Sequence, residues 1–331
     1  MNFSNLNKVV LTASLLATGF SYADSDRPLL SLSVSQSGGT ALNNEGSLDT
    51  RTPASQSRVL PIWGDEARAR GYDIAEPFGA SYNYMNLRQD VIVDKIAFGS
   101  DKPLGQNILS IVGVDVGHTR SSNESHMLKL DTWIFPFMNV YGIYGKTKGS
   151  SRAQLNAVTL GGQEIANDLP FNLDYEGKSY GGGFTLAGGY NQFFGTFDLN
   201  YTKTNLDIID GDIKALVITP RVGYEFIFSP LISGQGNTKL QVWTGAMYQD
   251  ITQRFKGDVS RLSLPEELDG MMNILPPSMM GNIKFDVEQH LAHKWNNTIG
   301  ARLELTRNFN VTTELGFNNR NSFFVSGEFR F

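Results

Sequence analysis

The stretch KALVITPRVGYEFIF, residues 214–228, divides into two rows of different character. The first row is Leu216, Ile218, Pro220, Val222, Tyr224, Phe226 and Phe228, and the second is Ala215, Val217, Thr219, Arg221, Gly223, Glu225 and Ile227. Successive side chains of a β-strand point to opposite faces, so this alternation predicts a strand with one apolar and one mixed face. The apolar face must contact either a protein interior or lipid.

The N-terminus, MNFSNLNKVVLTASLLATGFSYADSD, has the pattern of a secretory signal peptide. Lys8 is followed by a mostly apolar stretch at 9–20, and Ser21-Tyr22-Ala23 resembles a small-x-small cleavage site. We therefore expect residues 1–23 to be removed before Asp24. A membrane anchor is the alternative, but the apolar stretch is well short of the roughly 20 residues that span a bilayer. An exported protein without such a helix is soluble or spans a membrane as a closed sheet.

Composition excludes several classes of function. The 331 residues include no cysteine, which excludes a disulfide scaffold, a cysteine zinc site and a thiol nucleophile. The net charge is −5 without a basic patch, so no nucleic-acid partner is expected. A hydrophobic content of 40% permits one large all-β unit.

Alternating stretches separated by polar or Gly/Asn breaks continue to the end of the sequence. We predict about twelve strands, an even number as in bacterial single-chain barrels. A proline inside a closed sheet loses a ladder hydrogen bond, so we expect a bulge at Pro220. The predicted strands are 77–88, 91–98, 108–118, 126–135, 138–147, 178–190, 193–203, 213–228, 239–250, 295–306, 309–318 and 322–331.

The free-energy cost of placing a charge in lipid indicates which row of residues 214–228 faces lipid and which faces the lumen. Arg221 facing lipid near the midplane would cost roughly 2–4 kcal/mol, so the row that contains Val222 should face lipid and the other the lumen. The same sorting applies to 180–190, 298–305 and 311–317. The fold class is therefore all-β, a closed antiparallel transmembrane β-barrel of about 12 strands over 77–331. Residues 24–76 form an N-terminal extension, either periplasmic or inside the lumen.

Connection lengths and aromatic residues fit this orientation. With the C-terminus in the periplasm, the inner links are 99–107, 136–137, 191–192, 229–238 and 307–308, and the longest links, 148–177 and 251–294, lie outside. Aromatic residues gather at the predicted periplasmic strand ends, as in an interfacial girdle. Trp133 and Phe135 share the parity of Lys129, so they face lipid only if a bulge intervenes. A soluble β-sandwich with an aromatic core is the alternative interpretation.

The last residues, NSFFVSGEFRF at 321–331, alternate Phe323, Val325, Gly327, Phe329 and Phe331 with mostly polar residues. This pattern resembles the β-signal of Gram-negative outer-membrane β-barrel proteins. The resemblance implies recognition by the barrel-assembly machinery after export, and an outer-membrane location among lipid and lipopolysaccharide. It identifies no subfamily.

The row facing the lumen carries charges of both signs. They would form a polar pore whose wall selects solutes, or else ion pairs that close a narrow barrel. The mixed signs argue against sharp anion selectivity. The predicted lumen-lining charges are Asp115, Lys129, Asp131, Asp198, Arg221, Glu225, Arg302, Glu304, Glu314, Glu328 and Arg330.

Histidines near the predicted outer edge raise the possibility of catalysis. A lipid hydrolase would need a serine beside a histidine that a third group orients. Ser110, Ser121, Ser122, Ser125 and Glu124 lie near His118 and His126 in the sequence, but no hydrolase motif is present. His290 and His293 have no further ligand in view, so we predict no metal, cofactor or catalytic residue.

The loop at 262–282 contains the pairs Met271-Met272 and Met279-Met280. It would constrict the lumen, dock on lipopolysaccharide or a partner, or fold on itself. The leading functional hypothesis is a passive pore for small solutes, with the loops at 148–177 and 251–294 as candidate gates. An outer-membrane hydrolase acting on lipid and a structural or adhesive barrel with a filled lumen are the alternatives. The sequence does not predict an oligomeric state.

Overall fold

A computed structural model describes most of the protein from residue 59 onward. The described residues are 41–42, 48–49, 59–69, 74–103, 107, 112–190, 192–207, 210, 212–232, 237–261, 270 and 282–331. The predicted signal peptide, Ser110 and the methionine pairs at 271–272 and 279–280 lie outside these residues.

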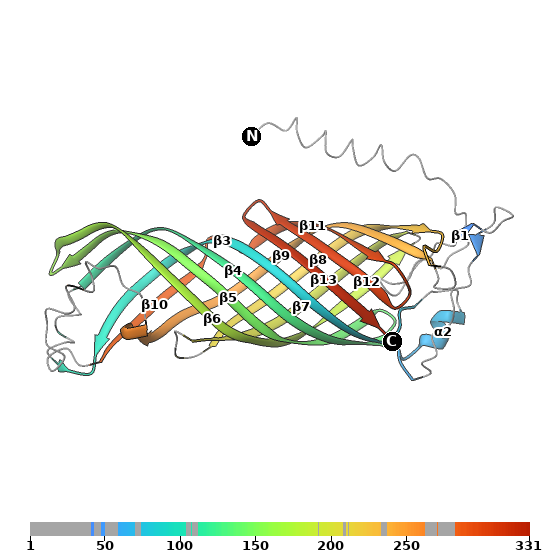
Figure 1. Cartoon of the computed structure of the whole chain (residues 1–331), viewed down its shortest axis with the longest axis horizontal. Coiled ribbons are helices and arrows are strands. Elements are labelled where there is room, and N and C mark those ends of the chain that lie inside the picture. Colours follow the sequence, from blue (N-terminus) through green and yellow to red (C-terminus); the bar gives the residue numbers. More distant parts are fainter. Residues whose placement is uncertain are drawn as a thin grey trace, which may run out of the picture.

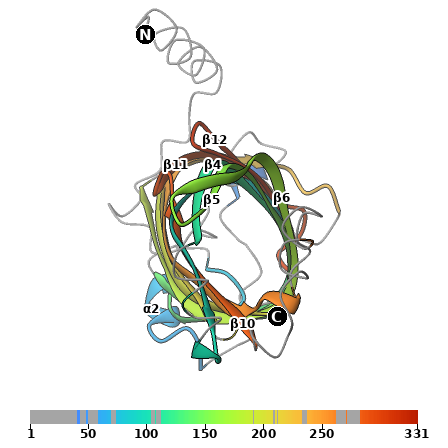
Figure 2. The ribbon, with the colours of Figure 1, turned by 90° about the vertical axis from the view of Figure 1, so that its left-hand side faces the viewer.

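Ten antiparallel strands close into a barrel, seen from the side in Figure 1 and along its length in Figure 2. Each strand pairs with its neighbour in sequence, except that β9 pairs with β11, and pairing of β13 and β4 with β3 closes the ring. The strands are β3 (Phe78–Ser100), β4 (Val112–Phe135), β5 (Met138–Leu160), β6 (Gln163–Tyr190), β7 (Phe193–Leu206), β8 (Asp212–Phe228), β9 (Thr238–Asp258), β11 (Trp295–Glu304), β12 (Phe309–Phe317) and β13 (Arg320–Arg330).

A further strand, β10 (Ile283–Leu291), extends the wall away from the C-terminus. It pairs with β9 on one side and with β3 on the other. After a break at 292–294 the backbone runs on along β9 as β11. The β12–β13 hairpin is short, so beyond its tip β10 lies directly between β9 and β3.

The described segments at 59–69 and 74–77 lie at the C-terminal end of the barrel. Helix α2 (Gly64–Ala69) lies beside this end of the barrel and outside the ring of strands (Figures 1 and 2). The Ile62 amide donates to the Ile134 carbonyl at 2.8 Å, and the Trp63 ring is 5.0 Å from that of Phe135. Two short strands, β1 (Ala41–Leu42) and β2 (Leu48–Asp49), pair only with each other, and a 3-10 helix, η1 (Val259–Arg261), follows β9. None of the helices in the described segments has the length and apolar character to cross a bilayer.

The predicted number of strands in the ring was too high. The stretches 77–88 and 91–98 belong to one strand, β3, and 108–118 and 126–135 belong largely to β4. The intervening residues are polar on both faces, and polar residues on both faces resemble a loop even when the backbone stays in the ladder. The described residues of the link at 99–107, predicted to be periplasmic, consequently lie at the opposite end of the barrel.

The long predicted loops also contain strand residues. Residues 148–177 continue β5 and β6 to a tight turn at Gly161 and Gly162, whose φ angles of 59° and 83° lie in the region that favours glycine. Residues 251–294 contain the end of β9, η1 and β10. These strands therefore continue well beyond the tip of the β12–β13 hairpin.

Two local predictions have different outcomes. The bulge expected at Pro220 is absent: Ile218 pairs with Tyr248 and Arg221 with Gly245, which leaves no extra residue on either strand. The proline interrupts the ladder toward β9 without shifting the register. A register shift does occur between Trp133 and Phe135, but it follows Trp133, whose side chain is only 6% exposed and faces the lumen.

Candidate functional site in the barrel lumen

The barrel has an inverted distribution of polarity. Buried residues include Thr298, Asn310, Glu314 and Arg330, all of which point into the barrel. The outward positions carry large exposed apolar side chains on every strand of the ring except β9. These include Tyr82, Leu128, Leu130, Tyr144, Tyr180, Leu186, Phe193, Phe197, Tyr201, Val222, Phe228, Trp295, Ile299, Phe309, Leu315, Phe317, Phe323, Phe329 and Phe331.

The lumen contains a cavity of about 510 Å³. Its lining reaches from Arg330, near the C-terminal end, to Leu206 and Phe255 in the outer part of the barrel. The charged residues of the lining all lie in the half nearer the C-terminus: Lys129, Asp198, Arg221, Arg302, Glu314, Glu328 and Arg330. The outer half is lined by apolar and uncharged polar side chains, among them Met85, Leu87, Met127, Thr204, Ile213, Val217, Met247 and Ile251.

Arg221 and Glu314 form an ion pair inside the barrel. Arg221 Nε is 2.6 Å from Glu314 Oε2, and Arg221 Nη2 is 2.9 Å from Oε1. The indole Nε1 of Trp243 donates to the same Glu314 Oε2 at 2.7 Å. Because β8 and β12 are separated by β9 and β11, this pair reaches past two strands and narrows the lumen.

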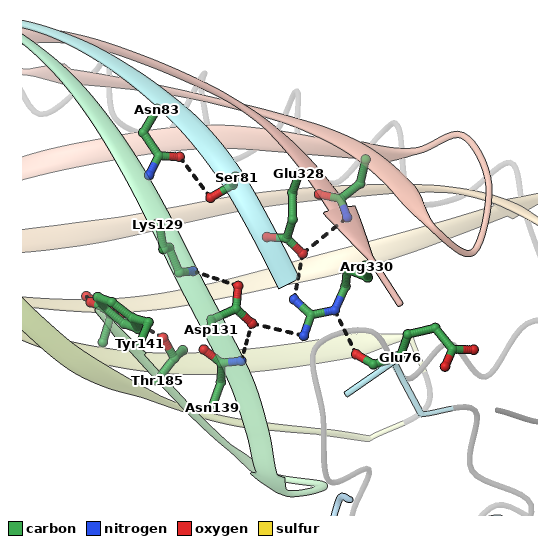
Figure 3. Close-up of polar contacts among 12 residues, drawn as sticks. Glu76, Ser81, Asn83, Lys129, Asp131, Asn139, Tyr141, Thr185, Glu328 and Arg330 are labelled. Atoms are coloured by element: carbon green, nitrogen blue, oxygen red, sulfur yellow. Dashed lines mark hydrogen bonds and ion pairs between the residues drawn. The ribbon is translucent and has the colours of Figure 1, made fainter. Parts of the chain in front are cut away.

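A second network surrounds Arg330 (Figure 3). Its Nη1 donates to Glu328 Oε1 at 2.7 Å, its Nη2 lies 2.9 Å from Asp131 Oδ1, and its Nε donates to the Glu76 carbonyl at 2.9 Å. Asn139 donates to Asp131 Oδ1 at 2.7 Å, and Arg302 Nη2 is 3.4 Å from Glu328 Oε1. The guanidinium group of Arg330 therefore links β4 and β13 to the segment that contains Glu76 and immediately precedes β3.

Between these networks, Asp198 accepts hydrogen bonds from neighbouring strands. The Tyr141 hydroxyl donates to Asp198 at 3.0 and 2.9 Å, and Thr185 donates to Oδ2 at 2.7 Å. Lys129 Nζ is 3.8 Å from Asp131 and 4.7 Å from the centroid of the Tyr141 ring. Charges of both signs are thus paired through most of this half of the lumen.

The remaining predicted lumen charges lie in different places. Glu225 is buried and accepts from Gln241 Nε2 at 2.7 Å, while Glu304 lies 3.3 Å from Lys239 Nζ near the C-terminal end. Asp115 is not in the cavity lining: it is exposed and accepts from Asn156 at 3.3 Å. Register shifts at Asp115/Val116 and Val116/Thr119 reverse the alternation in this part of β4, so the parity argument fails there.

The predicted assembly residues lie on the outward face of β13. Phe323, Phe329 and Phe331 are exposed, and the Phe331 ring lies 6.0 Å from that of Phe78. Val325 shares this face, and a Cβ at Gly327 would have no neighbour within 4 Å. The backbone of Phe331 still pairs with Phe78, because its amide donates to the Phe78 carbonyl at 2.9 Å.

Among the described residues, no hydrogen bond joins a histidine to a serine. His126 Nδ1 lies 2.6 Å from the Tyr82 hydroxyl and its Nε2 lies 3.1 Å from Glu124, on the outward face of the barrel. His118 lies 3.4 Å from Asp90, and His290 lies 2.7 Å from Asp94. Ser121 and Ser125 instead contact Tyr175 and Thr147. In the described part of the protein, no three His, Asp or Glu residues come together as metal ligands would, and His293 is exposed.

Sequence reasoning missed several residues of the networks. Tyr141, Trp243 and Lys239 were not predicted to face the lumen, because the prediction considered mainly charges in clean alternating stretches. Parity alone would have found all three: Tyr141 follows Asn139 by two residues, and Lys239 and Trp243 lie two residues on either side of Gln241. Glu76 has no such signal, since it precedes the barrel and enters the networks only through the fold.

No protein family and no curated protein matches the sequence. Several solved structures are similar in fold. The transport unit of the autotransporter AIDA-I from Escherichia coli aligns over 77% of this protein and 90% of its own length, with 8% identity and a TM-score of 0.32. The β domain of the Bordetella autotransporter BrkA aligns over 77% and 100%, with 10% identity and a TM-score of 0.29. The toluene transporter TbuX from Ralstonia pickettii aligns over 78% and 90%, with 10% identity and a TM-score of 0.28.

These similar structures are β-barrels of Gram-negative outer membranes, and this protein is a closed β-barrel as well. The closed barrel fold that the resemblance of the C-terminal pattern implies is present, and no subfamily is identified. With TM-scores near 0.3, the similarity concerns the barrel fold alone and says nothing about function.

Proposed function

We propose that the protein is an outer-membrane β-barrel that acts as a passive pore for small solutes. The inverted polarity of the barrel supports the membrane location. Soluble monomers rarely expose contiguous apolar patches larger than a few hundred Å², whereas here apolar side chains cover the outward face of nearly every strand. Lipid would solvate that face and leave the buried polar residues to the lumen.

The cavity in the lumen supports the pore. It passes along the barrel between the charged half and the outer half, and its volume of about 510 Å³ falls within the range of small-molecule sites. The outer half offers apolar and uncharged polar contacts but no charge. We therefore expect small uncharged solutes to enter from outside and to meet the narrowest passage at the Arg221–Glu314 pair.

Conductance in planar bilayers tests the proposal. The refolded mature protein should conduct, and vesicles that contain it should swell with small uncharged sugars. In the double variant Arg221→Ala and Glu314→Ala, both effects should increase, because the variant removes the side chains that cross the lumen. The exposed pair Asp250 and Lys294, 2.8 Å apart and outside the lumen, provides the matched control when both are changed to Ala.

A structural barrel with a filled lumen is the second candidate. The observation that favours it is the pairing of lumen charges from β4 to β13 and from β8 to β12. If neither the wild type nor the double variant conducts or supports swelling, the pore is wrong and the filled barrel is right. A lipid hydrolase is not proposed, because the hydrogen-bond partners of His126 are a tyrosine and a glutamate.

A further inference from the structure

Three neighbouring strands repeat one outward-facing pattern. On β5, β6 and β7 an exposed tyrosine is followed, one step further from the C-terminal end of the barrel, by a lysine on the same face. The pairs are Tyr144 with Lys146, Tyr180 with Lys178, and Tyr201 with Lys203. Because alternate residues share a face, each tyrosine and its lysine point the same way.

The lysines also lie beside one another across the strands. Lys146 pairs in register with Lys178, and Lys203 pairs in register with Lys214 on β8. Tyr180 pairs with Lys203, which joins the two pairs into one surface. The lysine row, defined as Lys146, Lys178, Lys203 and Lys214, therefore crosses four adjacent strands.

Most of this charge is not neutralised within the described part of the protein. Glu176 lies 3.9 Å from Lys146 Nζ and 3.2 Å from Lys148 Nζ. Lys178, Lys203 and Lys214 form no ion pair with a described carboxylate, although Glu176 and Asp212 lie on the same face two residues from Lys178 and Lys214. Five lysines thus stand beside three acidic residues on this part of the wall, Glu124, Glu176 and Asp212. Glu124 and Glu176 both pair in register with Lys148, one step beyond the row, so only Asp212 lies at the level of the row itself. Like charges on directly opposed residues of neighbouring strands are destabilising, so the row needs an external anion.

The position of the row identifies the anion. Tyrosine is favoured where a membrane meets water, because its ring suits lipid and its hydroxyl suits water. A lysine one step further out, about 5 Å at the usual strand tilt, lies at the depth of lipid headgroups. The end of the barrel opposite the C-terminus is the outer one in the orientation predicted for outer-membrane barrels, so the headgroups in reach belong to the outer leaflet.

We propose that the lysine row binds the phosphate groups of lipopolysaccharide, with the tyrosines of the same strands against its acyl chains. The proposal rests on the outer-membrane location proposed above and names the lipid that this side of the barrel holds. Lysine ammonium groups bind phosphates as point charges, which suits a row of separate lysines better than a single bidentate site.

The test uses the refolded protein in detergent micelles and titrates bisphosphorylated lipid A, with binding followed by native mass spectrometry. The triple variant Lys178→Gln, Lys203→Gln and Lys214→Gln should bind lipid A on the order of a hundredfold more weakly, at roughly fivefold for each lysine near an anionic surface. Lys294→Gln should bind as the wild type does, because Lys294 is already paired with Asp250 at 2.8 Å and is not part of the lysine row. Added salt should weaken wild-type binding and leave the triple variant nearly unchanged.

Two further probes identify the ligand group. Dephosphorylated lipid A should bind the wild type as weakly as lipid A binds the triple variant. Inorganic phosphate at millimolar concentration should not displace lipid A, because it lacks the acyl chains that contact the tyrosines. Equal binding of lipid A by the wild type and the triple variant overturns the proposal, and so does full displacement by inorganic phosphate.

Failure of this proposal is distinguishable from failure of the pore. The three lysines lie outside the lumen, so the triple variant should fold and conduct as the wild type does. If the wild-type protein conducts but binds lipid A no better than the triple variant, only the proposed lipid site is wrong. If the protein does not insert into vesicles at all, the proposed membrane location is wrong, and the proposed lipid site is wrong with it.

Discussion

Arg221 on β8 and Glu314 on β12 make a two-point contact inside the barrel, at 2.6 and 2.9 Å, past the two strands that separate them. Trp243 on the intervening β9 donates to the same carboxylate at 2.7 Å. Three strands are therefore tied together from within, where a water-filled barrel would hold only solvent. The pair both narrows the lumen and braces the wall, and these two roles predict different results on substitution.

Glu314→Gln should destabilise the folded barrel by about 3 kcal/mol or more, because it leaves the guanidinium of Arg221 without its carboxylate in a largely enclosed place. The double variant Arg221→Met and Glu314→Met should recover most of that loss, since it removes both charges together. Urea unfolding in lipid vesicles measures both free energies. Equal destabilisation by the single and double variants would contradict this account of the pair.

Arg320 should anchor the tip of the β12–β13 hairpin. Its side chain is buried and donates to Gln249 Oε1 at 2.6 Å and to the carbonyls of Met247 and Lys294 at 3.2 and 3.3 Å. Arg320→Ala should cost about 3 kcal/mol, because hydrogen bonds from a charged donor are lost at a buried site.

Hydrogen exchange checks the location of that effect. Amides of residues 316–322 should exchange faster in Arg320→Ala, while those of β6 and β7 stay protected. Arg88→Ala is the matched control, since Arg88 is exposed on the outward face of β3 opposite Asn321. Unchanged exchange at the hairpin would mean that the tip is held by other contacts.

Val222→Arg should cost about 2–4 kcal/mol in lipid vesicles, because Val222 is 63% exposed on the apolar outward face of β8. Val222→Leu at the same site keeps an apolar group and should change stability little. In a water-soluble barrel an exposed arginine would be harmless. A fully stable Val222→Arg variant would therefore argue against lipid at this face.

The β9–β10 extension should loosen in acid. Arg254 Nε and Nη2 donate to Asp286 at 2.8 and 2.7 Å, and Lys256 Nζ lies 3.6 Å from the same carboxylate. The hydrogen bond from Arg254, aided by the charges of Arg254 and Lys256, lowers the pKa of Asp286 below its ordinary value of 3.8. A lowered pKa means that the contact contributes fully above the pKa of the unfolded state and is lost as pH falls through the lower, folded-state value.

Hydrogen exchange of β10 at pH 7 and near pH 2 tests this dependence. Protection should decrease in acid in the wild type, whereas Asp286→Asn should already be less protected at neutral pH and change little between the two conditions. Arg254 is half exposed, so the effect should stay local to the extension. Identical pH profiles in the two proteins would remove Asp286 as the cause.

Phe331→Ala should slow assembly more than it changes stability. The Phe331 ring is 60% exposed on the outward face, so little packing is lost, yet it ends the alternating pattern that resembles the β-signal. Insertion into vesicles that contain the purified barrel-assembly machinery should be slower than for the wild type. Phe228→Ala is the control, because Phe228 is also exposed and outward-facing but ends an earlier strand. Equal insertion rates for all three proteins would contradict an assembly role.

Much of the barrel was predictable because its strands follow a period of two wherever one face of the wall is apolar and the other lines the lumen. In β8 the separation of Val222 from Arg221 was visible in the sequence, and the structure places them on opposite faces of the wall. The number of strands was not predictable in the same way. Where β3 passes Gln89 and Asp90 into water, neither face must be apolar, so the pattern disappears although the ladder continues.

The candidate site depended on contacts between residues far apart in the sequence. Alternation could place Arg221, Glu314 and Arg330 on the lumen side, but it could not pair them, because the pairs cross strands at a distance set by the closure of the ring. Glu76 joined the site through the path of the N-terminal segment, and Asp115 left it through register shifts in β4. The direction in which a side chain points is a local property of the backbone, so the pattern of residues along a strand predicts it. Which groups meet inside a barrel is a property of strand order, register and closure, and these arise only when the whole protein has folded.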